Sequence, residues 1–317
     1  MQNIAVVGLG SISDRHRKNL IEMYPSAIIH AISSSGKLKG RIIKNSHFTH
    51  INKQSLAGIT LDFVLICSPA TFHLEDIIFF SKKNIPIFVE KPLFSDHQLD
   101  SIDAKYLLKI KNKVALGYCL RFLPSLLKFK SIIDSKELGK IINIKTSAGQ
   151  LLSDWRPLKN MNQVVSSSKK LGGGVLLELS HEIDYLQWIF GSLKLEKSIL
   201  RNTKILDLDV EDVADLLATT KNNAVVNIHL DLLSARPHRF CKVICEGGDL
   251  LWNYIDQTIT LYKKENIEII FKGEVDDTNK MYKYMLKNFL LSSNTSPFKG
   301  ANIQNGIDVL KFIQDAR

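Results

Sequence analysis

A lysine placed between a strand and a proline is the residue of this chain best suited to move a proton. Glu90-Lys91-Pro92 follows the apolar run Ile87-Phe88-Val89, which predicts a buried strand. The carboxyl ends of parallel strands border the crevice in which open α/β sheets hold their ligands. We therefore expect Lys91 to point its ammonium group toward a bound ligand and to exchange a proton there. A surface lysine in a turn is the plain alternative.

A second group of polar side chains follows a run of three glycines, on a helix that the pattern predicts over residues 175–190. The spacing of Glu178, His181 and Tyr185 puts them on one helical face, and Asp184 adjoins it. A histidine between two acids suits acid–base catalysis, although a lone helical histidine is more often structural. We expect His181 and Glu178 to be catalytic, and Asp184 and Tyr185 to contact substrate.

The start of the chain carries the pattern of a dinucleotide-binding turn. The apolar run 4–7 leads into Gly8-x-Gly10-x-x-Ser13, and a helical pattern follows. The first glycine permits the turn, and the second lets the backbone approach a pyrophosphate at the positive end of the helix. Ser13 replaces the usual third glycine or alanine but is also small. A fortuitous turn is the alternative. Cofactor contacts are predicted for Gly8, Gly10, Ser11 and Ile12.

The second expected strand, 28–33, ends without the carboxylate that usually binds the adenosine ribose of NAD. Lys39 and Arg41 lie a few residues beyond it. Hydroxyl groups and cations at this position suit a ribose 2′-phosphate, so NADP is favoured over NAD. The residues expected there are Ser33, Ser34, Ser35 and Lys37.

A further cofactor-contacting segment is expected after the buried strand 61–67. Ser68-Pro69 and His73 follow this strand at the carboxyl edge of the sheet and are predicted to line the nicotinamide ribose, with His73 mainly in a supporting role. Glu90 and Lys91 are expected to border the same site. A loop that only starts a helix is the alternative.

These segments require a particular fold class. Strand patterns alternate with helical ones up to residue 118, which predicts an α/β protein with an N-terminal Rossmann, doubly wound parallel sheet. Later β-rich runs predict a C-terminal α/β domain with an open, mostly antiparallel sheet. We place the dinucleotide-binding domain at 1–120 and the substrate-binding and oligomerisation domain at 121–317. The last helix, 303–316, is a candidate to pack back on the first domain.

The bulk composition describes an ordinary globular protein. The 317 residues favour two domains, and 45% of them are hydrophobic and 23% charged. The net charge of +10 comes from lysines spread along the whole chain, which favours a solvated basic surface over nucleic-acid binding. No run approaches the roughly 20 apolar residues of a membrane helix. The first residues show no export signal, so a cytoplasmic protein without a membrane partner is expected.

The cysteines do not form a metal-binding pattern. Cys67, Cys119, Cys241 and Cys245 lie in apolar segments, and no second Cys or His pair completes a ligand set. We expect buried thiols and no metal.

The motifs in combination resemble the Gfo/Idh/MocA oxidoreductases, the family of glucose-fructose oxidoreductase and inositol dehydrogenase. The resemblance extends over essentially the whole chain. It is carried by Gly8-x-Gly10, Ser68-Pro69 with His73, Glu90-Lys91-Pro92, Gly117-Tyr118 with Arg121-Phe122, and residues 172–184. It implies a Rossmann domain, a second domain whose open sheet often mediates dimers or tetramers, and NAD(P)-linked oxidation or reduction of a sugar-like hydroxyl or ketone.

The resemblance also implies roles for individual residues. Lys91 matches the family's lysine that assists proton transfer or holds the reacting oxygen, and His181 matches a histidine that commonly acts as acid or base. Glu178 matches an acid that supports the substrate or the histidine. The family usually has an aspartate four residues before its histidine, whereas Glu178 precedes His181 by three; Ser13 is the other departure.

Three segments resemble a branch associated with bacterial surface-polysaccharide and nonulosonic-acid gene clusters: Arg15-His16, 154–157 and 179–182. Trp155 would suit a sugar face and Arg156 an anionic group. Arg121 is expected to help orient the substrate. A loop that packs locally is an equal alternative for Trp155 and Arg156.

The predicted function is hydride transfer between NAD(P) and a hydroxyl or ketone carbon of a sugar, nucleotide-sugar or sugar acid. Lys91 and His181 would handle the proton. One alternative is an epimerase, lyase or glycosidase that uses transient oxidation on the same fold. Another is a non-catalytic dinucleotide sensor, which would not need Lys91 and His181 together. A homodimer or homotetramer is expected.

Overall fold

The computed structural model describes residues 2–38, 43–101, 104–110, 114–155, 168, 171–275, 278–292 and 296–317. The chain divides into two compact units. The first comprises Met1–Cys119 with Tyr282–Ile307, and the second comprises Leu120–Met281 with Asp308–Arg317. The first unit thus includes a C-terminal segment that lies within the range expected for the second domain. Among the described helices, none has the length and apolar character needed to cross a bilayer.

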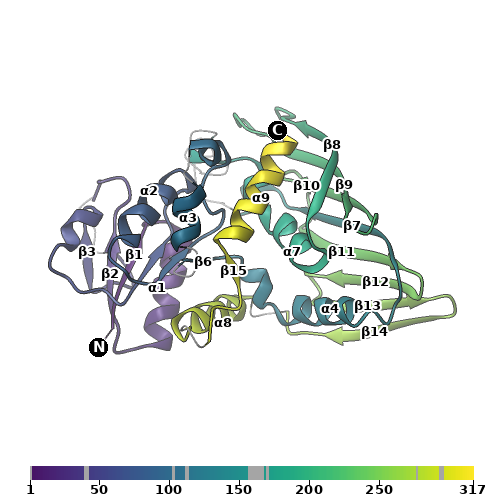
Figure 1. Cartoon of the computed structure of the whole chain (residues 1–317), viewed down its shortest axis with the longest axis horizontal. Helices are drawn as coiled ribbons and strands as arrows, with labels where there is room; N and C mark the ends of the chain where they lie inside the picture. The colour runs from purple at the N-terminus through teal and green to yellow at the C-terminus, as the bar shows by residue number, and fades with distance from the viewer. Residues whose placement is uncertain are drawn as a thin grey trace. The chain divides into compact units, whose positions relative to one another are not determined.

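The first unit is built on a seven-stranded sheet with the order β15-β6-β5-β4-β1-β2-β3 (Figure 1). The strands β1 to β6 pair in parallel, and β15 pairs antiparallel with β6. Their bounds are β1 Asn3–Val7, β2 Ile28–Ile32, β3 Phe48–His50, β4 Phe63–Ile66, β5 Ile87–Val89, β6 Val114–Leu116 and β15 Ala301–Asn302. The central strands are apolar and buried, which is typical of a parallel sheet covered on both faces. The predicted Rossmann-like sheet is confirmed.

The helices of the first unit are distributed over both faces because the strand order reverses at β1 and β4. Helix α1 (Ser11–Met23) connects β1 to β2, and α2 (Ala70–Ser81) connects β4 to β5 in the opposite direction along the sheet. Right-handed crossovers then place the two helices on opposite faces. Ligands of such sheets bind beyond the carboxyl ends of the strands at this reversal.

The C-terminal part of the first unit packs through helix α8 (Asn279–Leu290). Phe289 contacts Phe63 of β4 and Phe88 of β5, with ring centroids 5.7 and 5.5 Å away. Lys283 forms a 2.9 Å ion pair with Glu22 of α1. These contacts explain why a segment so late in the chain belongs to the N-terminal unit, a relation that no local sequence pattern reveals.

The second unit contains an eight-stranded sheet with the order β14-β13-β12-β11-β7-β10-β9-β8. All pairs are antiparallel except β7 with β10. Their bounds are β7 Ile141–Gly149, β8 Leu193–Arg201, β9 Val213–Thr220, β10 Val225–Asp231, β11 His238–Cys245, β12 Gly248–Asn253, β13 Thr258–Lys263 and β14 Asn266–Lys272. The predicted open, mostly antiparallel sheet is confirmed.

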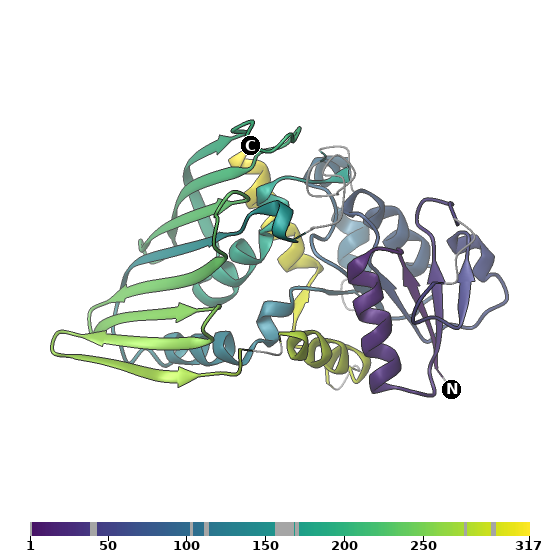
Figure 2. The same ribbon diagram turned by 180° about the vertical axis from the view of Figure 1, so that it is seen from behind.

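Helices cover only one face of this second sheet. Figures 1 and 2 show α4 (Pro124–Ser135), α7 (Ser180–Phe190) and the end of α9 (Ile303–Ala316) on the same side of it. Trp252 of β12 lies in the core between sheet and helices, with its ring 5.6 Å from that of Tyr185 and 6.5 Å from that of Phe129. Burial alternates along β9, as expected when the opposite face of a sheet is open.

Candidate active site

The turn between β1 and α1 has the geometry that a pyrophosphate requires. Gly8 has a φ of +102°, and a Cβ atom on it would lie 2.5 Å from the carbonyl oxygen of Cys67. Gly10 is the exposed N-cap residue of α1, and a Cβ atom on it would meet no atom within 4 Å. Gly8 is therefore needed for packing, whereas Gly10 leaves the backbone at the helix N-terminus open to an anion. The turn fits the diphosphate of a dinucleotide.

Ser13 fills the third position of the motif without disturbing it. Its side chain is buried, and its Oγ donates a hydrogen bond to the Gly10 carbonyl oxygen at 2.7 Å. Ser11 is exposed and Ile12 is half-buried in the first turn of α1. Both lie beside the helix N-terminus, and their contact with a cofactor stays a prediction.

A buried arginine holds this turn by hydrogen bonds to backbone carbonyl groups. Arg17 donates to the carbonyl oxygens of Gly8 at 3.4 Å and Lys44 at 3.1 Å, and to Asp14 at 3.2 Å. Burial lowers the pKa of its guanidinium, and Asp14 opposes that shift. Arg17 could not be predicted as part of the site, because arginine is normally exposed and the local sequence pattern does not show that it packs against the loop.

The segment after β2 presents hydroxyl groups and a cation. Ser33 is buried, and its Oγ donates to the Lys37 carbonyl oxygen at 3.1 Å and lies 3.5 Å from the Ser35 hydroxyl. Ser34 is half-buried, and Ser35 and Lys37 are exposed. Lys39 and Arg41 lie outside the described residues.

His73 connects the loops that follow β4 and β5. Its ring nitrogens lie 2.6 Å from the Ser68 carbonyl oxygen and 2.9 Å from the Pro92 carbonyl oxygen. Ser68 Oγ donates to Asp76 at 3.1 Å, while Pro69 caps α2. Burial is the main cause that lowers the pKa of His73. The ring therefore positions the two loops, and a contact with the cofactor is better placed on Ser68 and Pro69.

Glu90 and Lys91 follow β5 at the same edge of the sheet. The Glu90 side chain is buried, with Oε1 2.6 Å from His16 Nε2 and Oε2 accepting from the Lys91 main-chain N–H at 3.2 Å. Lys91 is half-buried and precedes a cis peptide bond to Pro92. The Glu90 carboxylate is thus engaged inside the unit, where it holds the Lys91 main chain; its contact with a cofactor stays a prediction.

In the second unit, the expected single helix over 175–190 is interrupted. Helix α6 (Val175–Glu178) ends at Leu179, whose φ of −100° and ψ of 30° break the regular spiral, and α7 starts at Ser180. Glu178 and His181 therefore lie on different helices, and the prediction that they share one helical face is wrong. His181 is buried in the first turn of α7, and Glu178 is half-buried.

Two residues expected to contact substrate are paired with each other instead. Arg121 Nε and Nη2 donate to the two carboxylate oxygens of Asp184 at 2.9 and 2.7 Å, and both side chains are buried. The Arg121 guanidinium also lies 5.3 Å from the ring of Trp188. Burial raises the pKa of Asp184, and Arg121 opposes this. The pair holds the turn at Cys119–Phe122 to α7, and so supports the helix that carries His181.

Tyr185 belongs to the core of the second unit and not to a substrate surface. Its hydroxyl is hydrogen-bonded to Thr146 Oγ1, its ring packs on Trp252, and burial raises its pKa. The Tyr185 side chain points toward the sheet because α7, the helix that carries it, packs on that sheet. Trp155 ends the short helix α5 (Leu152–Trp155); its side chain and Arg156 lie outside the described residues.

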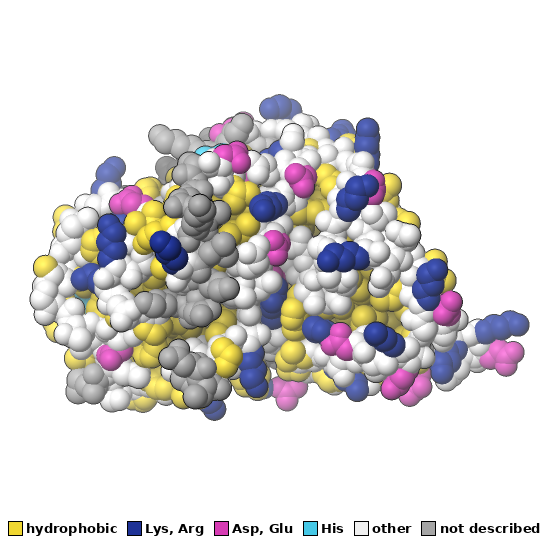
Figure 3. Space-filling view, in the orientation of Figure 1, with side chains coloured by type: hydrophobic (Ala, Val, Ile, Leu, Met, Phe, Trp, Pro, Cys, Tyr) yellow, Lys and Arg dark blue, Asp and Glu magenta, His cyan; other side chains and the backbone are white. Residues whose placement is uncertain are grey.

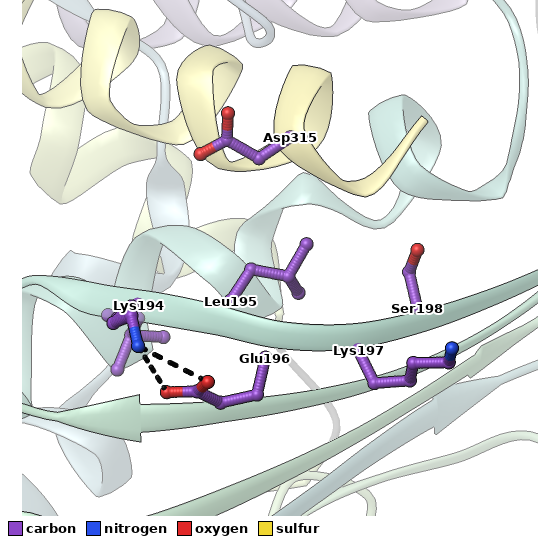
Figure 4. Close-up of a pocket in the computed structure, with 7 residues that line it drawn as sticks. Lys194, Leu195, Glu196, Lys197, Ser198 and Asp315 are labelled. Atoms are coloured by element: carbon purple, nitrogen blue, oxygen red, sulfur yellow. Dashed lines mark hydrogen bonds and ion pairs between the residues drawn. The ribbon is translucent and has the colours of Figure 1, made fainter.

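Hollows elsewhere in the second unit do not include the predicted site residues. One lies between β8 and the C-terminal helix and is lined by residues 193–198 and Asp315; Lys194 and Glu196, both on β8, form an ion pair along the strand (Figure 4). Another lies on the open face of the sheet beside His229 and Leu217. Figure 3 shows lysine and arginine side chains scattered singly over the visible face, with acidic ones among them. Within the described residues no cluster of His, Cys, Asp and Glu could hold a metal.

Comparison with protein families decides the assignment. The oxidoreductase family with an NAD-binding Rossmann fold matches residues 2–117, and the GFO/IDH/MocA C-terminal domain matches residues 126–251. The chain belongs to the Gfo/Idh/MocA oxidoreductase family. Its first unit therefore has an NAD-binding Rossmann fold, as the resemblance implied.

Curated relatives of this family member align over part of their length. It is 28% identical to the uncharacterized oxidoreductase YrbE of Bacillus subtilis (strain 168) over 70% of this chain and 65% of that protein. It is 27% identical to the scyllo-inositol 2-dehydrogenase (NAD(+)) of the same organism over 59% of this chain and 54% of that protein. The chain thus aligns with less than two thirds of the length of either relative.

Solved structures of two dehydrogenases share the fold over the whole chain. A levoglucosan dehydrogenase in complex with NADH and L-sorbose has a TM-score of 0.83, with 16% identity and coverage of 100% of this chain and 96% of that one. The myo-inositol 2-dehydrogenase from Lactobacillus plantarum has a TM-score of 0.80, with 17% identity and coverage of 99% and 96%. At such identity the likeness establishes the fold.

Proposed function

We propose that this chain is an NAD(P)-dependent dehydrogenase of a cyclic polyol, sugar or sugar derivative. The observation that carries the proposal is the carboxyl edge of the first sheet. The open helix end at Gly10 follows β1 there and Lys91 follows β5, with β4 between the two strands. A dinucleotide-binding turn and a lysine whose main chain is held at the same sheet edge suit a hydride-transfer enzyme. Family membership and relatives that act on inositols support the same reaction class.

The cofactor, when bound, supplies the hydride chemistry. The chain's own residues bind, orient and move protons. The N–H groups at the start of α1 would hold the diphosphate, since they point outward at the positive end of the helix. Ser68 and Pro69 would border the nicotinamide ribose, with His73 fixing the loop that carries them.

Lys91 and His181 are the groups proposed to handle the proton of the reacting hydroxyl. The ammonium of Lys91 can hold the substrate oxygen by a charge-assisted hydrogen bond, and the imidazole of His181 can take up or return its proton near neutral pH. The proposal requires the two units to bring these side chains to one substrate carbon. Glu178, Trp155 and Arg156 remain candidates to support the substrate or His181.

NADP is the cofactor form that the segment after β2 favours. Hydroxyl groups and Lys37 stand where an NAD-specific enzyme would have a carboxylate to bind the ribose 2′-hydroxyl. The solved structures with NADH bound show that the fold itself also accepts the unphosphorylated form. Kd values for NADH and NADPH, from quenching of intrinsic fluorescence, would decide this; tighter binding of NADH would reject the preference.

The open face of the second sheet supports a proposal of self-association. Ile199, Ile267 and Ile269 are 56, 69 and 60% exposed on it, and Leu217 and Val225 lie on the same face. These side chains lie near the two edges of the face, Ile267 and Ile269 on β14 and the other three on β8, β9 and β10. Exposed aliphatic side chains on a helix-free sheet face suit an interface. We propose a homodimer or homotetramer through this face; light scattering on Ile267→Glu against wild type tests it, and a monomeric wild type rejects it.

A substrate panel tests the proposed activity. myo-Inositol, scyllo-inositol, glucose 6-phosphate, levoglucosan and available sugar acids and nucleotide-sugars are each supplied with NAD⁺ or NADP⁺, and the formation of reduced nicotinamide is followed. Stoichiometric reduction supports a dehydrogenase. Product without net reduction indicates transient oxidation in an epimerase, lyase or glycosidase. Tight cofactor binding that is indifferent to Lys91→Ala, without turnover of any compound, indicates a sensor.

A further inference from the structure

His16 is a buried residue to which the proposed reaction assigns no role. It lies in the second turn of α1, and its exposed fraction is 0%. Its Nε2 lies 2.6 Å from Oε1 of Glu90, which is 74 positions further along the chain. Phe88 of β5 and Tyr282 of α8 hold its ring edge-on, with centroids 5.5 and 6.0 Å away. A polar ring enclosed in this way normally has one specific partner, and here that partner precedes Lys91.

The Glu90 carboxylate links His16 to the backbone of Lys91. Oε1 is bonded to His16, and Oε2 accepts from the Lys91 main-chain N–H at 3.2 Å. A Cβ atom on Gly117 would lie 3.0 Å from Oε1, so the end of β6 confines the carboxylate from another side. Hydrogen bonds to an ionised acceptor are stronger than neutral ones, and two of them restrict how the carboxylate can turn.

The surroundings of His16 favour Nε2 as the donor atom. Within the part of the chain that the structure describes, the buried Nδ1 atom has no hydrogen-bond partner. An N–H buried without an acceptor costs about 1–3 kcal/mol, which disfavours a proton there. A proton on Nε2 therefore fits the contact, and His16 acts as a fixed donor to Glu90.

We propose that His16 is a positioning residue for Lys91, acting through the Glu90 carboxylate. The contact joins α1, whose first turn would hold the diphosphate of the cofactor, to the loop that places the proton-handling ammonium. One buried hydrogen bond, between His16 and Glu90, then fixes the position of Lys91 relative to the bound cofactor. This inference rests on the proposed function of Lys91.

Substitution of His16 separates positioning from simple packing. His16→Leu fills the space without a donor, whereas the amide nitrogen of His16→Gln can reach the place of Nε2. We expect His16→Leu to lower kcat about tenfold to a hundredfold, because misplacement of a catalytic group by about 1 Å has effects of that size. The Kd for the cofactor should change less than about threefold. His16→Gln should recover most of the lost kcat.

Leu20→Ala is the matched control, since Leu20 is one helical turn from His16, is fully buried and has no contact with Glu90 among those described. It should lower the thermal midpoint as much as His16→Leu and leave kcat unchanged. Equal loss of kcat in Leu20→Ala and His16→Leu would mean that stability alone is responsible and would overturn the inference. So would an unchanged kcat in His16→Leu, or no recovery in His16→Gln.

A readout that needs no substrate keeps the inference independent of the reaction. Brief acetylation followed by mass spectrometry reports the reactivity of Lys91 relative to the exposed Lys264. We expect His16→Leu to change this ratio severalfold and His16→Gln to restore it; an unchanged ratio counts against positioning. If Lys91→Ala keeps wild-type kcat, the proposed function fails, whatever the labelling shows. If Lys91→Ala is inactive but His16→Leu keeps the wild-type kcat, the proposed function stands and only the positioning role of His16 is rejected.

Discussion

The two sheets of this protein place polar residues in opposite ways. In the parallel sheet of the first unit both faces are covered, so polar groups gather at the strand ends, in the turns after β1, β4 and β5. In the second unit one whole face is open, and polar side chains such as His229 and Asp215 lie across neighbouring strands of it. A site at strand ends depends on backbone geometry, whereas one on a helix above a sheet depends on side-chain direction.

The largest expected effects come from replacing the two residues proposed to handle the proton, one in each unit. Lys91→Ala in the first unit and His181→Ala in the second should each lower kcat about a hundredfold to ten-thousandfold, the range for loss of a general acid or base. Cofactor affinity should be kept. Steady-state kinetics with the best substrate of the panel measures this, with Lys264→Ala as the surface control. A full effect from only one of the two would place the proton chemistry in a single unit.

The Arg121–Asp184 pair tests whether the second unit uses its buried charges for support. Arg121→Ala should lower the free energy of unfolding by about 3–5 kcal/mol, because Asp184 is left as a buried, unpaired carboxylate. The double replacement Arg121→Met with Asp184→Leu should be far less destabilising. Urea unfolding measures both, with the exposed pair Lys194–Glu196 as a control that should show no change. A stable Arg121→Ala variant that binds substrate poorly would restore the original assignment of Arg121 to substrate.

The two glycines of the first turn should separate stability from binding. Gly8→Ala combines a φ of +102° with a clash against Cys67 and should cost about 1–3 kcal/mol or more. Gly58→Ala is its control, since Gly58 has a φ of +81° but open space for a Cβ atom. Gly10→Ala should fold normally and weaken NADH binding about tenfold, or about 1.4 kcal/mol. Thermal unfolding and cofactor titration measure these, and normal binding by Gly10→Ala would move the diphosphate elsewhere.

The smallest effects should appear as opposite pH dependences of the two units. Burial lowers the pKa of His30 and of His50, so the first unit should lose stability as pH falls below about 6.5, where the unfolded histidines take up protons. Asp231 and Asp215 raise the pKa of His229 to about 9, so that stabilisation is complete below 6.5 and lost as pH rises through about 9. Thermal midpoints across pH measure this, and His229→Gln should flatten only the alkaline limb. An unaltered alkaline limb would mean that His229 does not contribute.

Motifs that constrain the backbone could be predicted from the sequence, whereas side-chain partners in the second unit could not. The alternation of strands and helices predicts the strand ends, and these carry Gly8, Gly10 and Lys91. Both faces of a parallel sheet are buried, so its polar groups lie where the strands end. Asp184 and Tyr185 were assigned to substrate from helical spacing alone. The break at Leu179 and the presence of the sheet beneath α7 turned them toward Arg121 and Thr146, and spacing contains no information on either.

The family, the parallel sheet and the dinucleotide turn could be predicted from the amino-acid sequence, since they follow from short patterns of glycine and apolar residues that act locally. The folded chain alone reveals which buried charges are paired, that residues 282–307 complete the first unit, and that His16 contacts Glu90. Those outcomes depend on contacts between residues far apart in the chain. Hydrogen bonds between the partners offset the cost of burying these polar groups, and no single segment contains both partners.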